Sequence, residues 1–161
     1  MKDLKKQLRN LNVSKLKMKN GNSVESEMKR HAFILADCIM EELDKVYYSY
    51  QPKVYLRTYD LYSSLYVDDN FEIRVSGKGA TLSIGIHFND GAMHESFNGN
   101  FANTAILINE GWKTNGNFAD IPYLGYREGT HFIENGIKEY KRKVSNPFPV
   151  RFKINDEERL F

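Results

Sequence analysis

The feature that most constrains the fold is a long stretch of apolar residues at helical spacing. After the turn signal of residues 20–23 (Asn-Gly-Asn-Ser), apolar side chains recur at steps of three and four. They are Met28, Ala32, Leu35, Ile39, Leu43 and Val46. This spacing predicts one buried face of an α-helix of about 25 residues. Asn22 followed by Glu25 predicts its start as a capping box, and Pro52 lies just beyond its end.

The apolar arc of this helix is wider than a single stripe. Phe33, Ile34, Cys38 and Met40 extend it, so we expect the helix to be buried on more than one side or to meet a second subunit. Cys38 is the single cysteine of the chain, which excludes an internal disulfide and a cysteine-based zinc cluster. Its apolar neighbours predict an inert core thiol.

Two runs with alternating apolar residues occupy the middle of the chain. The apolar positions are Phe71, Ile73 and Val75 before a Gly-rich turn at residues 76–79, and Leu82, Ile84, Ile86 and Phe88 after it. Period two on both sides of such a turn predicts an antiparallel β-hairpin with one face on the core. A short helix over residues 59–66, capped by Thr58, is expected just before it.

The second half of the chain contains shorter elements and two expected loops, residues 89–103 and 112–129, which are rich in turn-forming residues. A short helix over 102–108 ends at Gly111. A helix over 131–144 is capped by Thr130, and Gly136 in its interior weakens it by about 1 kcal/mol relative to alanine. Residues 148–154 alternate as an edge strand.

Together these elements predict an α+β fold. A long N-terminal helix and a C-terminal helix pack on a small antiparallel sheet, formed by the hairpin and the C-terminal edge strand, with long loops between. We expect a basic N-terminal arm at 1–22, one α+β domain at 23–155 and a C-terminal tail at 156–161; the length of 161 residues suits one such domain. The longest apolar run, residues 32–36, is far short of the roughly 20 residues that span a bilayer, so no membrane contact is expected.

Charge is concentrated at the N-terminus. Residues 1–20 carry a net charge of +6, whereas the other 141 residues carry −4. The basic side chains of this arm are Lys2, Lys5, Lys6, Arg9, Lys15, Lys17 and Lys19. Such an arm suits contact with DNA or with the acidic face of a neighbouring protein, and a solvated N-terminus is the alternative.

The sequence lacks the common catalytic motifs. The sequence has no Walker loop and no Gly-x-Ser-x-Gly elbow. His87, Asp90 and His94 lie close in sequence, but the second histidine of a zinc-protease helix is missing after His94-Glu95. We therefore expect no catalytic site, no cofactor and no metal, with these three as polar loop residues.

Tyrosine is unusually clustered. Seven of the ten tyrosines fall within residues 47–66, and Tyr59, Tyr62 and Tyr66 follow helical spacing. Tyrosine offers a large contact area with a polar tip, which suits protein interfaces. We interpret this face as one that meets another protein chain; the alternative is that half of these rings cover the hairpin.

Residues 55–65 (Tyr-Leu-Arg-Thr-Tyr-Asp-Leu-Tyr-Ser-Ser-Leu) resemble a motif of the tail-completion, or head–tail joining, proteins of long-tailed double-stranded DNA phages. In that family an Arg-Thr pair opens a short helix, with leucine three residues after the threonine and Ser-Ile or Ser-Leu three further on. The resemblance implies that Thr58 caps, that Leu61 and Leu65 pack inward, and that Arg57 pairs with an acid or anchors a neighbouring chain.

The order of elements over residues 25–145 is also similar to that family. The later matching segments are residues 105–111 (Ala-Ile-Leu-Ile-Asn-Glu-Gly) and 130–137 (Thr-His-Phe-Ile-Glu-Asn-Gly-Ile). The sequence departs from the family pattern at Tyr59, where glycine is common, and at Trp112, where threonine is expected. No Arg-Pro pair precedes Phe132.

The resemblance implies a non-enzymatic virion protein of the phage neck or tail, assembled in the host cytoplasm. Such a subunit forms a homo-oligomeric ring between the portal–connector complex and the tail, with DNA passing through its channel. The residues assigned to its interfaces are Arg57, Thr58, Tyr59, Tyr62, Tyr66 and Trp112. Two alternatives are a small nucleic-acid-binding protein that uses the basic arm and a small hydrolase with a site at His87 and His94.

Overall fold

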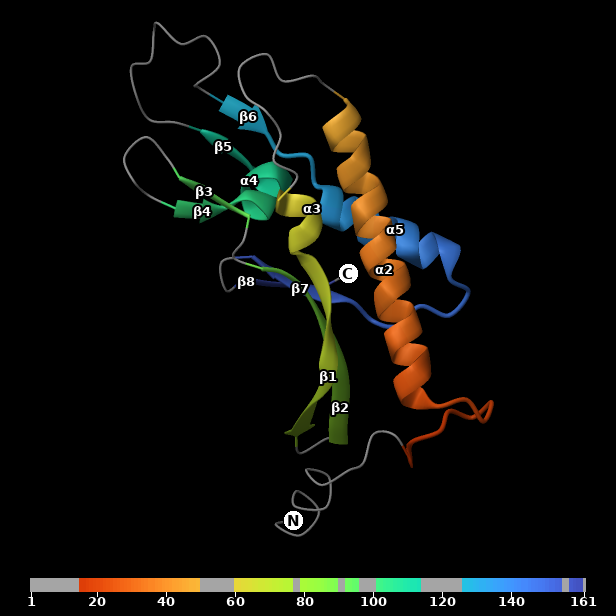
Figure 1. Ribbon diagram of the computed structural model, residues 1–161. Helices are drawn as coiled ribbons and strands as arrows, with labels where there is room; N and C mark the ends of the chain where they lie inside the picture. The colour runs from red at the N-terminus through yellow and green to blue at the C-terminus, as the bar shows by residue number, and fades with distance from the viewer. Residues whose placement is uncertain are drawn as a thin grey trace, which may run out of the picture.

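The computed structural model describes residues 15–49, 60–76, 79–89, 92–95, 101–113, 126–154 and 157–160. Within these ranges the chain is an α+β protein with a long N-terminal helix, a two-stranded antiparallel hairpin and a C-terminal helix (Figure 1). The predicted fold class is therefore confirmed. Of the described helices, none is both long and apolar enough to cross a membrane. The predictions for Pro52 and Thr58 lie outside the described residues.

The long helix α2 spans Val24–Tyr48, which is 25 residues as predicted. Its N-cap is Ser23, whose hydroxyl accepts a hydrogen bond from the Ser26 N–H. The predicted capping box of Asn22 and Glu25 is therefore wrong by one residue. Asn22 belongs to the preceding turn, because its N–H donates to the Asn20 side chain.

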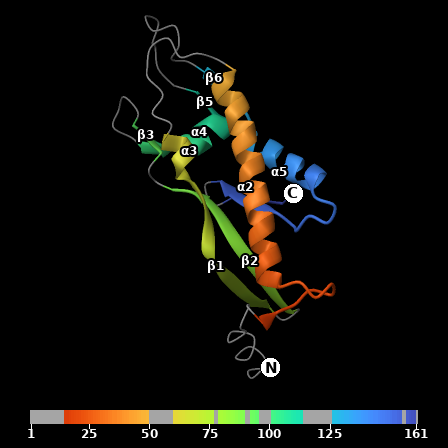
Figure 2. The same cartoon turned by 45° about the vertical axis from the view of Figure 1, so that its right-hand side comes forward.

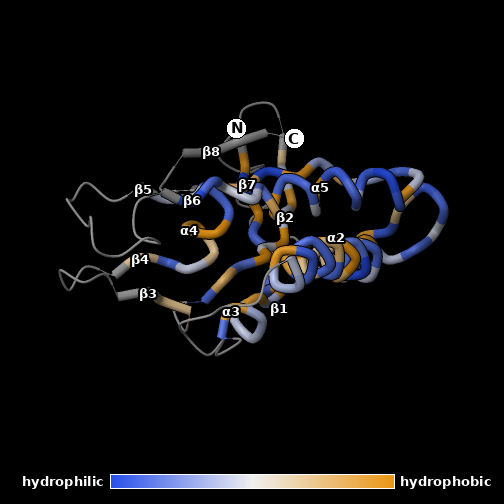
Figure 3. The backbone as a smooth tube through the Cα atoms, turned by 90° about the horizontal axis from the view of Figure 1, so that it is seen from above, coloured by the Kyte–Doolittle hydropathy of each residue, from blue (hydrophilic) through white to orange (hydrophobic). Residues whose placement is uncertain are grey.

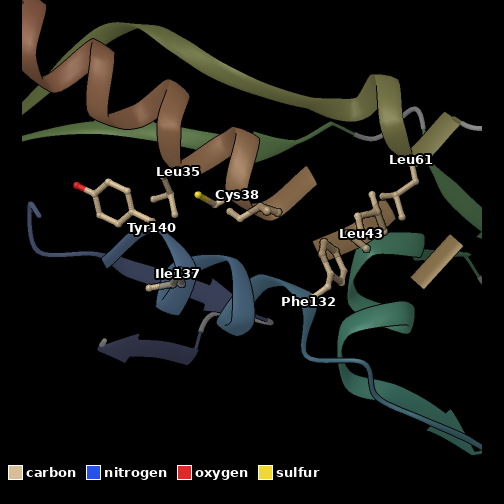
Figure 4. Close-up of a cluster of buried hydrophobic side chains, with 10 residues drawn as sticks. Leu35, Cys38, Leu43, Leu61, Phe132, Ile137 and Tyr140 are labelled. Atoms are coloured by element: carbon tan, nitrogen blue, oxygen red, sulfur yellow. The ribbon is translucent and has the colours of Figure 1, made fainter. Parts of the chain in front are cut away.

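The C-terminal helix α5, Phe132–Lys143, packs against α2. Ile137 and Tyr140 of α5 are buried together with Leu35 and Cys38 of α2 in one core cluster, as Figure 4 shows. A Cβ at Gly136 would lie 2.7 Å from the Ile39 Cα, so glycine permits the two helix backbones to approach closely. Burial raises the pKa of the Cys38 thiol, in keeping with the core position predicted for it.

A buried polar link ties three segments together. The Tyr140 hydroxyl is hydrogen-bonded to the His31 Nδ1 of α2 at 2.7 Å and accepts the N–H of Phe148 at 2.9 Å. The His31 ring also lies edge-on to Phe148, with ring centroids 4.6 Å apart. Burial, with the Arg30 charge as a second cause, lowers the pKa of His31, whereas burial raises the pKa of Tyr140.

The predicted hairpin is confirmed and is longer than expected. Strand β1, Leu65–Ser76, pairs antiparallel with β2, Gly79–Phe88, and the register is irregular between Val67 and Phe71. Figures 1 and 2 show this hairpin running beside the N-terminal half of α2. The preceding helix α3 spans only Asp60–Ser64, so the prediction of a helix over 59–66 is wrong at its end. Leu65 and Tyr66 join β1 instead, opposite Phe88 and His87.

Three further pairs of strands and one helix complete the described chain. They are β3 (Met93–Glu95) with β4 (Phe101–Asn103), α4 (Thr104–Glu110), β5 (Gly111–Lys113) with β6 (Tyr126–Glu128), and β7 (Arg151–Ile154) with β8 (Glu157–Leu160). The expected loops 89–103 and 112–129 therefore contain short strands. The prediction that the C-terminal strand joins the sheet of the hairpin is wrong. Strand β7 pairs instead with β8, in the segment expected to be a tail, because nearby segments pair at low cost in loop entropy.

The core lies where α2, α3, α4 and α5 meet the base of the hairpin. Leu43, Leu61 and Phe132 come together there from three different helices (Figure 4). Hydrophobic stretches of α2, α4 and β2 lie toward the middle of the molecule, whereas the outer turns of α5 are hydrophilic (Figure 3). Helix α2 is covered on two sides, by α5 and by the hairpin, but Phe33 remains 58% exposed.

Candidate functional site

The junction between α4 and α5 brings together the two later segments that carried the family resemblance. Asn109, at the end of α4, is fully buried. Its Oδ1 accepts the N–H of Ile133 at 2.9 Å, and its Nδ2 donates to the Glu110 Oε1 at 2.8 Å. The His131 N–H in turn donates to the Asn109 carbonyl at 3.0 Å. One asparagine therefore fixes both the start of α5 and the carboxylate of its neighbour.

The backbone around this junction has two residues with positive φ. Gly111 has φ +79°, and a Cβ there would collide with the Arg127 carbonyl of the neighbouring strand. His131, at the N-cap position of α5, has φ 51° and ψ 34° and makes no side-chain capping bond. Thr130, the predicted cap, instead donates its hydroxyl to the Ile108 carbonyl at 2.9 Å. Docking onto α4 thus overrides the usual capping preference of threonine.

Three potential metal ligands converge at the junction. One ligand atom each of Glu110, His131 and Glu134 lies within 4.8 Å of the others. The His131 Nδ1 and the Glu134 Oε1 are 3.9 Å apart. Glu134 is buried in the first turn of α5, Glu110 is half-buried and His131 is exposed. Sequence reasoning missed this cluster; the His-x-x-Glu spacing was visible, but the third member lies 21 residues earlier.

A shallow depression of about 260 Å³ lies on the surface between α2 and the start of α5. Thr130, Phe132 and Asn135 line one side of it, and Lys45 and Val46 of α2 line the other. Lys45 is ion-paired with Glu42 at the same rim. Val46 and Phe132 are the apolar members of this lining, and the others are polar or charged.

Trp112, one of the predicted interface residues, lies on β5 directly after this junction. It is half-buried and stands opposite Arg127 in the pairing with β6. Arg57, Thr58 and Tyr59, which were predicted to share an interface with it, lie outside the described residues.

The predicted tyrosine face is divided by the structure. Tyr62 of α3 is half-buried and its ring lies 5.0 Å from that of Tyr47 on α2. Tyr66 lies on β1, is 47% exposed and contacts the His87 ring on β2, with centroids 5.4 Å apart. The expectation that these two tyrosines share one helical face is therefore wrong, because α3 ends at Ser64.

The histidines weighed as metal ligands are placed only in part. The His87 Nε2 lies 2.9 Å from the Asp68 Oδ2 across the hairpin, and both side chains are partly exposed. Asp90 and the side chain of His94 lie outside the described residues. His87 and Asp68 thus form a surface pair beside Tyr66.

Of the predicted basic arm, Lys15, Lys17 and Lys19 are described, and all three are exposed. Lys17 and Ser23 form an antiparallel bridge that holds the chain just before α2. Lys2, Lys5, Lys6 and Arg9 lie outside the described residues.

The structure thus defines a small α+β protein in which buried hydrogen bonds join α4 to α5 and the hairpin exposes Tyr66. The family model YomN matches residues 1–147, and the chain therefore belongs to the YomN family, a phage-derived protein family. Comparisons with curated proteins and with solved structures found no match.

Proposed function

We propose that this protein is a structural, non-catalytic subunit of a phage neck or tail. In this proposal it forms the ring that joins the portal–connector complex to the tail. The observation that carries the proposal is membership of a phage-derived family over residues 1–147. The resemblance of residues 55–65, 105–111 and 130–137 to tail-completion proteins supplies the finer assignment.

The described surface supports a role in protein contacts. Three large aromatic side chains are exposed on it: Tyr48 at 84%, Phe33 at 58% and Tyr66 at 47%. Exposed aromatic residues are enriched at protein interfaces. A subunit of a ring uses two different surfaces for its two neighbours, and α2 and the hairpin offer such surfaces on one small chain.

The test is to find the protein in the particle and to remove it. Purified virions are imaged by electron microscopy, with the chain located by a specific antibody, and particles that lack it are compared with the wild type. We expect the label at the head–tail junction, and separate heads and tails when the protein is missing. Normal joined particles without the protein would overturn the proposal.

A second function, binding of nucleic acid through the basic arm, is favoured by the exposure of Lys15, Lys17 and Lys19. Binding through these lysines would weaken steeply with salt. A Lys17→Gln/Lys19→Gln variant is compared with a Lys138→Gln/Lys141→Gln variant, which removes two exposed lysines of α5. Loss of DNA binding in the first variant alone would support this function, whereas no binding at low salt would exclude it.

A further inference from the structure

We propose that Glu110, His131 and Glu134 bind one divalent transition-metal ion, with Zn²⁺ as the probe. Their ligand atoms lie within 4.8 Å of one another. Zinc bonds to imidazole nitrogen and carboxylate oxygen are about 2.0–2.2 Å long, so two ligands of one ion lie at most about 4.4 Å apart. Small side-chain adjustments are enough to close the site around an ion.

The chemistry of the three ligands selects the kind of ion. Two carboxylates supply the charge that balances a divalent cation, and one imidazole favours zinc and its transition-metal neighbours over magnesium and calcium. Three protein ligands with a remaining position for water are a common arrangement for zinc.

The surroundings of the three ligands hold them in place. The buried amide of Asn109 donates to the Glu110 Oε1 at 2.8 Å, a contact of the kind that orients ligating carboxylates. The His131 backbone is fixed by its N–H bond to the Asn109 carbonyl and by the Asn135 N–H, which donates to the His131 carbonyl at 2.9 Å.

The ligands come from both sides of the junction, Glu110 from the end of α4 and the other two from the start of α5. An ion bound to all three would therefore cross-link the two helices at the point where the Asn109 bonds already join them. Because an ion that binds only the folded chain stabilises it, zinc should raise the melting temperature.

The competing explanation is that Glu134 only compensates the positive end of the α5 dipole. The two explanations differ in the role of His131, which contributes to the metal site but not to the dipole. His131→Asn separates them. Asparagine tolerates the left-handed backbone better than most residues, so this variant should fold as well as the wild type.

Zinc binding to the full chain is measured by titration calorimetry and by thermal unfolding. We expect one Zn²⁺ per chain and a higher melting temperature, with Mg²⁺ having no comparable effect. His131→Asn and Glu110→Gln should each weaken zinc binding at least about tenfold. Glu139→Gln, which removes a half-buried carboxylate that pairs with Arg142 in a later turn of the same helix, should bind zinc like the wild type.

Two outcomes would overturn the metal site. One is the absence of stoichiometric zinc binding by the folded wild-type chain at millimolar zinc. The other is a His131→Asn variant that binds zinc as tightly as the wild type, because the ion would then be held elsewhere, for example at the His87–Asp68 pair.

Discussion

The helical core and the β-hairpin bury their apolar side chains to different degrees. In the core, Leu43, Ile137 and Tyr140 are almost completely removed from solvent. In the hairpin, the inward-facing side chains of β1 and β2, such as Ile73 and Ile84, are only half-buried, and Tyr66 on the opposite face is exposed. The described residues pair only two strands in this sheet, and a two-stranded hairpin is marginal on its own.

The two regions therefore have different roles in the molecule. We expect the helices to supply most of the stability, because their contacting side chains are buried and the buried polar groups of His31, Tyr140 and Asn109 are hydrogen-bonded. The hairpin keeps apolar and aromatic surface accessible, which a second protein chain can cover. If the two regions differ in this way, substitutions in the helical core cost the most stability and substitutions on the outer face of the hairpin cost the least.

Truncation of a core leucine should cost much more stability than truncation of a hairpin isoleucine. Leu43→Ala should lower the free energy of unfolding by about 2–5 kcal/mol, because it leaves a cavity in a fully buried site. Ile84→Ala, at a half-buried position, should cost less than half as much. Urea unfolding followed by circular dichroism measures both, and equal losses would contradict the proposed difference between the two regions.

The second largest loss of stability is expected when the Asn109 side chain, which joins α4 to α5, is removed. Asn109→Ala leaves the Ile133 N–H without its buried acceptor, which should cost about 1–3 kcal/mol. Asn103→Ala is a matched control, since the Asn103 side chain accepts the Ala105 N–H at the other, partly buried end of the same helix. Urea unfolding measures both variants. A larger loss of stability in Asn103→Ala would show that the Asn109 bonds do not stabilise the fold more than an ordinary helix cap does.

The close approach of α2 and α5 should make alanine unfavourable at Gly136. Alanine favours a helix over glycine by about 1 kcal/mol, but its Cβ would press on the Ile39 backbone at a cost of about 1–3 kcal/mol. We therefore expect a net loss of stability. Lys138→Ala on the exposed side of α5 should change stability by less than about 0.5 kcal/mol. A more stable Gly136→Ala variant would show that the helices do not pack this closely.

The buried imidazole of His31 should make stability depend on pH. Burial lowers the pKa of His31 in the folded chain, so the unfolded chain takes up a proton first as the pH falls below its ordinary value of about 6.5. The associated stability is fully present above that pH and is lost as the pH falls through the folded pKa, by at most about 1.4 kcal/mol per pH unit.

The His31→Gln variant keeps a side chain that can bond to the Tyr140 hydroxyl but cannot titrate. Thermal unfolding between pH 7 and pH 5 should therefore show a weaker pH dependence in this variant than in the wild type. Parallel curves for the two proteins would assign the pH dependence to other groups.

The smallest effect on stability is expected at the outer face of the hairpin. Tyr66→Ser removes a cross-strand contact with His87 and should cost less than about 1 kcal/mol. If the hairpin meets a second chain, light scattering should show weaker assembly of Tyr66→Ser than of Lys138→Ser, which changes an exposed side chain of α5 outside both proposed surfaces. A Tyr66→Ser variant that unfolds like Leu43→Ala would place this residue in the core instead.

The sequence patterns predicted those elements whose periodicity is long. The spacing from Met28 to Val46 located α2, and the alternation on both sides of residues 76–79 located the hairpin. Boundaries were less certain, because single polar residues compete for the same role: Ser23 rather than Asn22 caps α2. Likewise, Leu65 and Tyr66 belong to β1 rather than to the predicted helix, because they pair with Phe88 and His87.

The candidate site was less predictable than the fold. Asn109 and Glu134 carry no signal in a single sequence, since a buried asparagine and an exposed one look the same. The Gly136 position could be recognised only as a weak point of a helix. Its actual role depends on the distance to Ile39, which lies almost 100 residues earlier.

The periodicity of apolar residues by itself determined that α2, α5 and the hairpin form, because burying a continuous apolar face requires a matching repeat along the chain. The tertiary structure alone decided that α4 and α5 meet at Asn109 and that Glu110 lies close to His131 and Glu134. It also decided that Tyr62 contacts Tyr47, whereas Tyr66 contacts His87. These relations depend on how distant elements pack, and packing geometry leaves no periodic trace in the order of the residues.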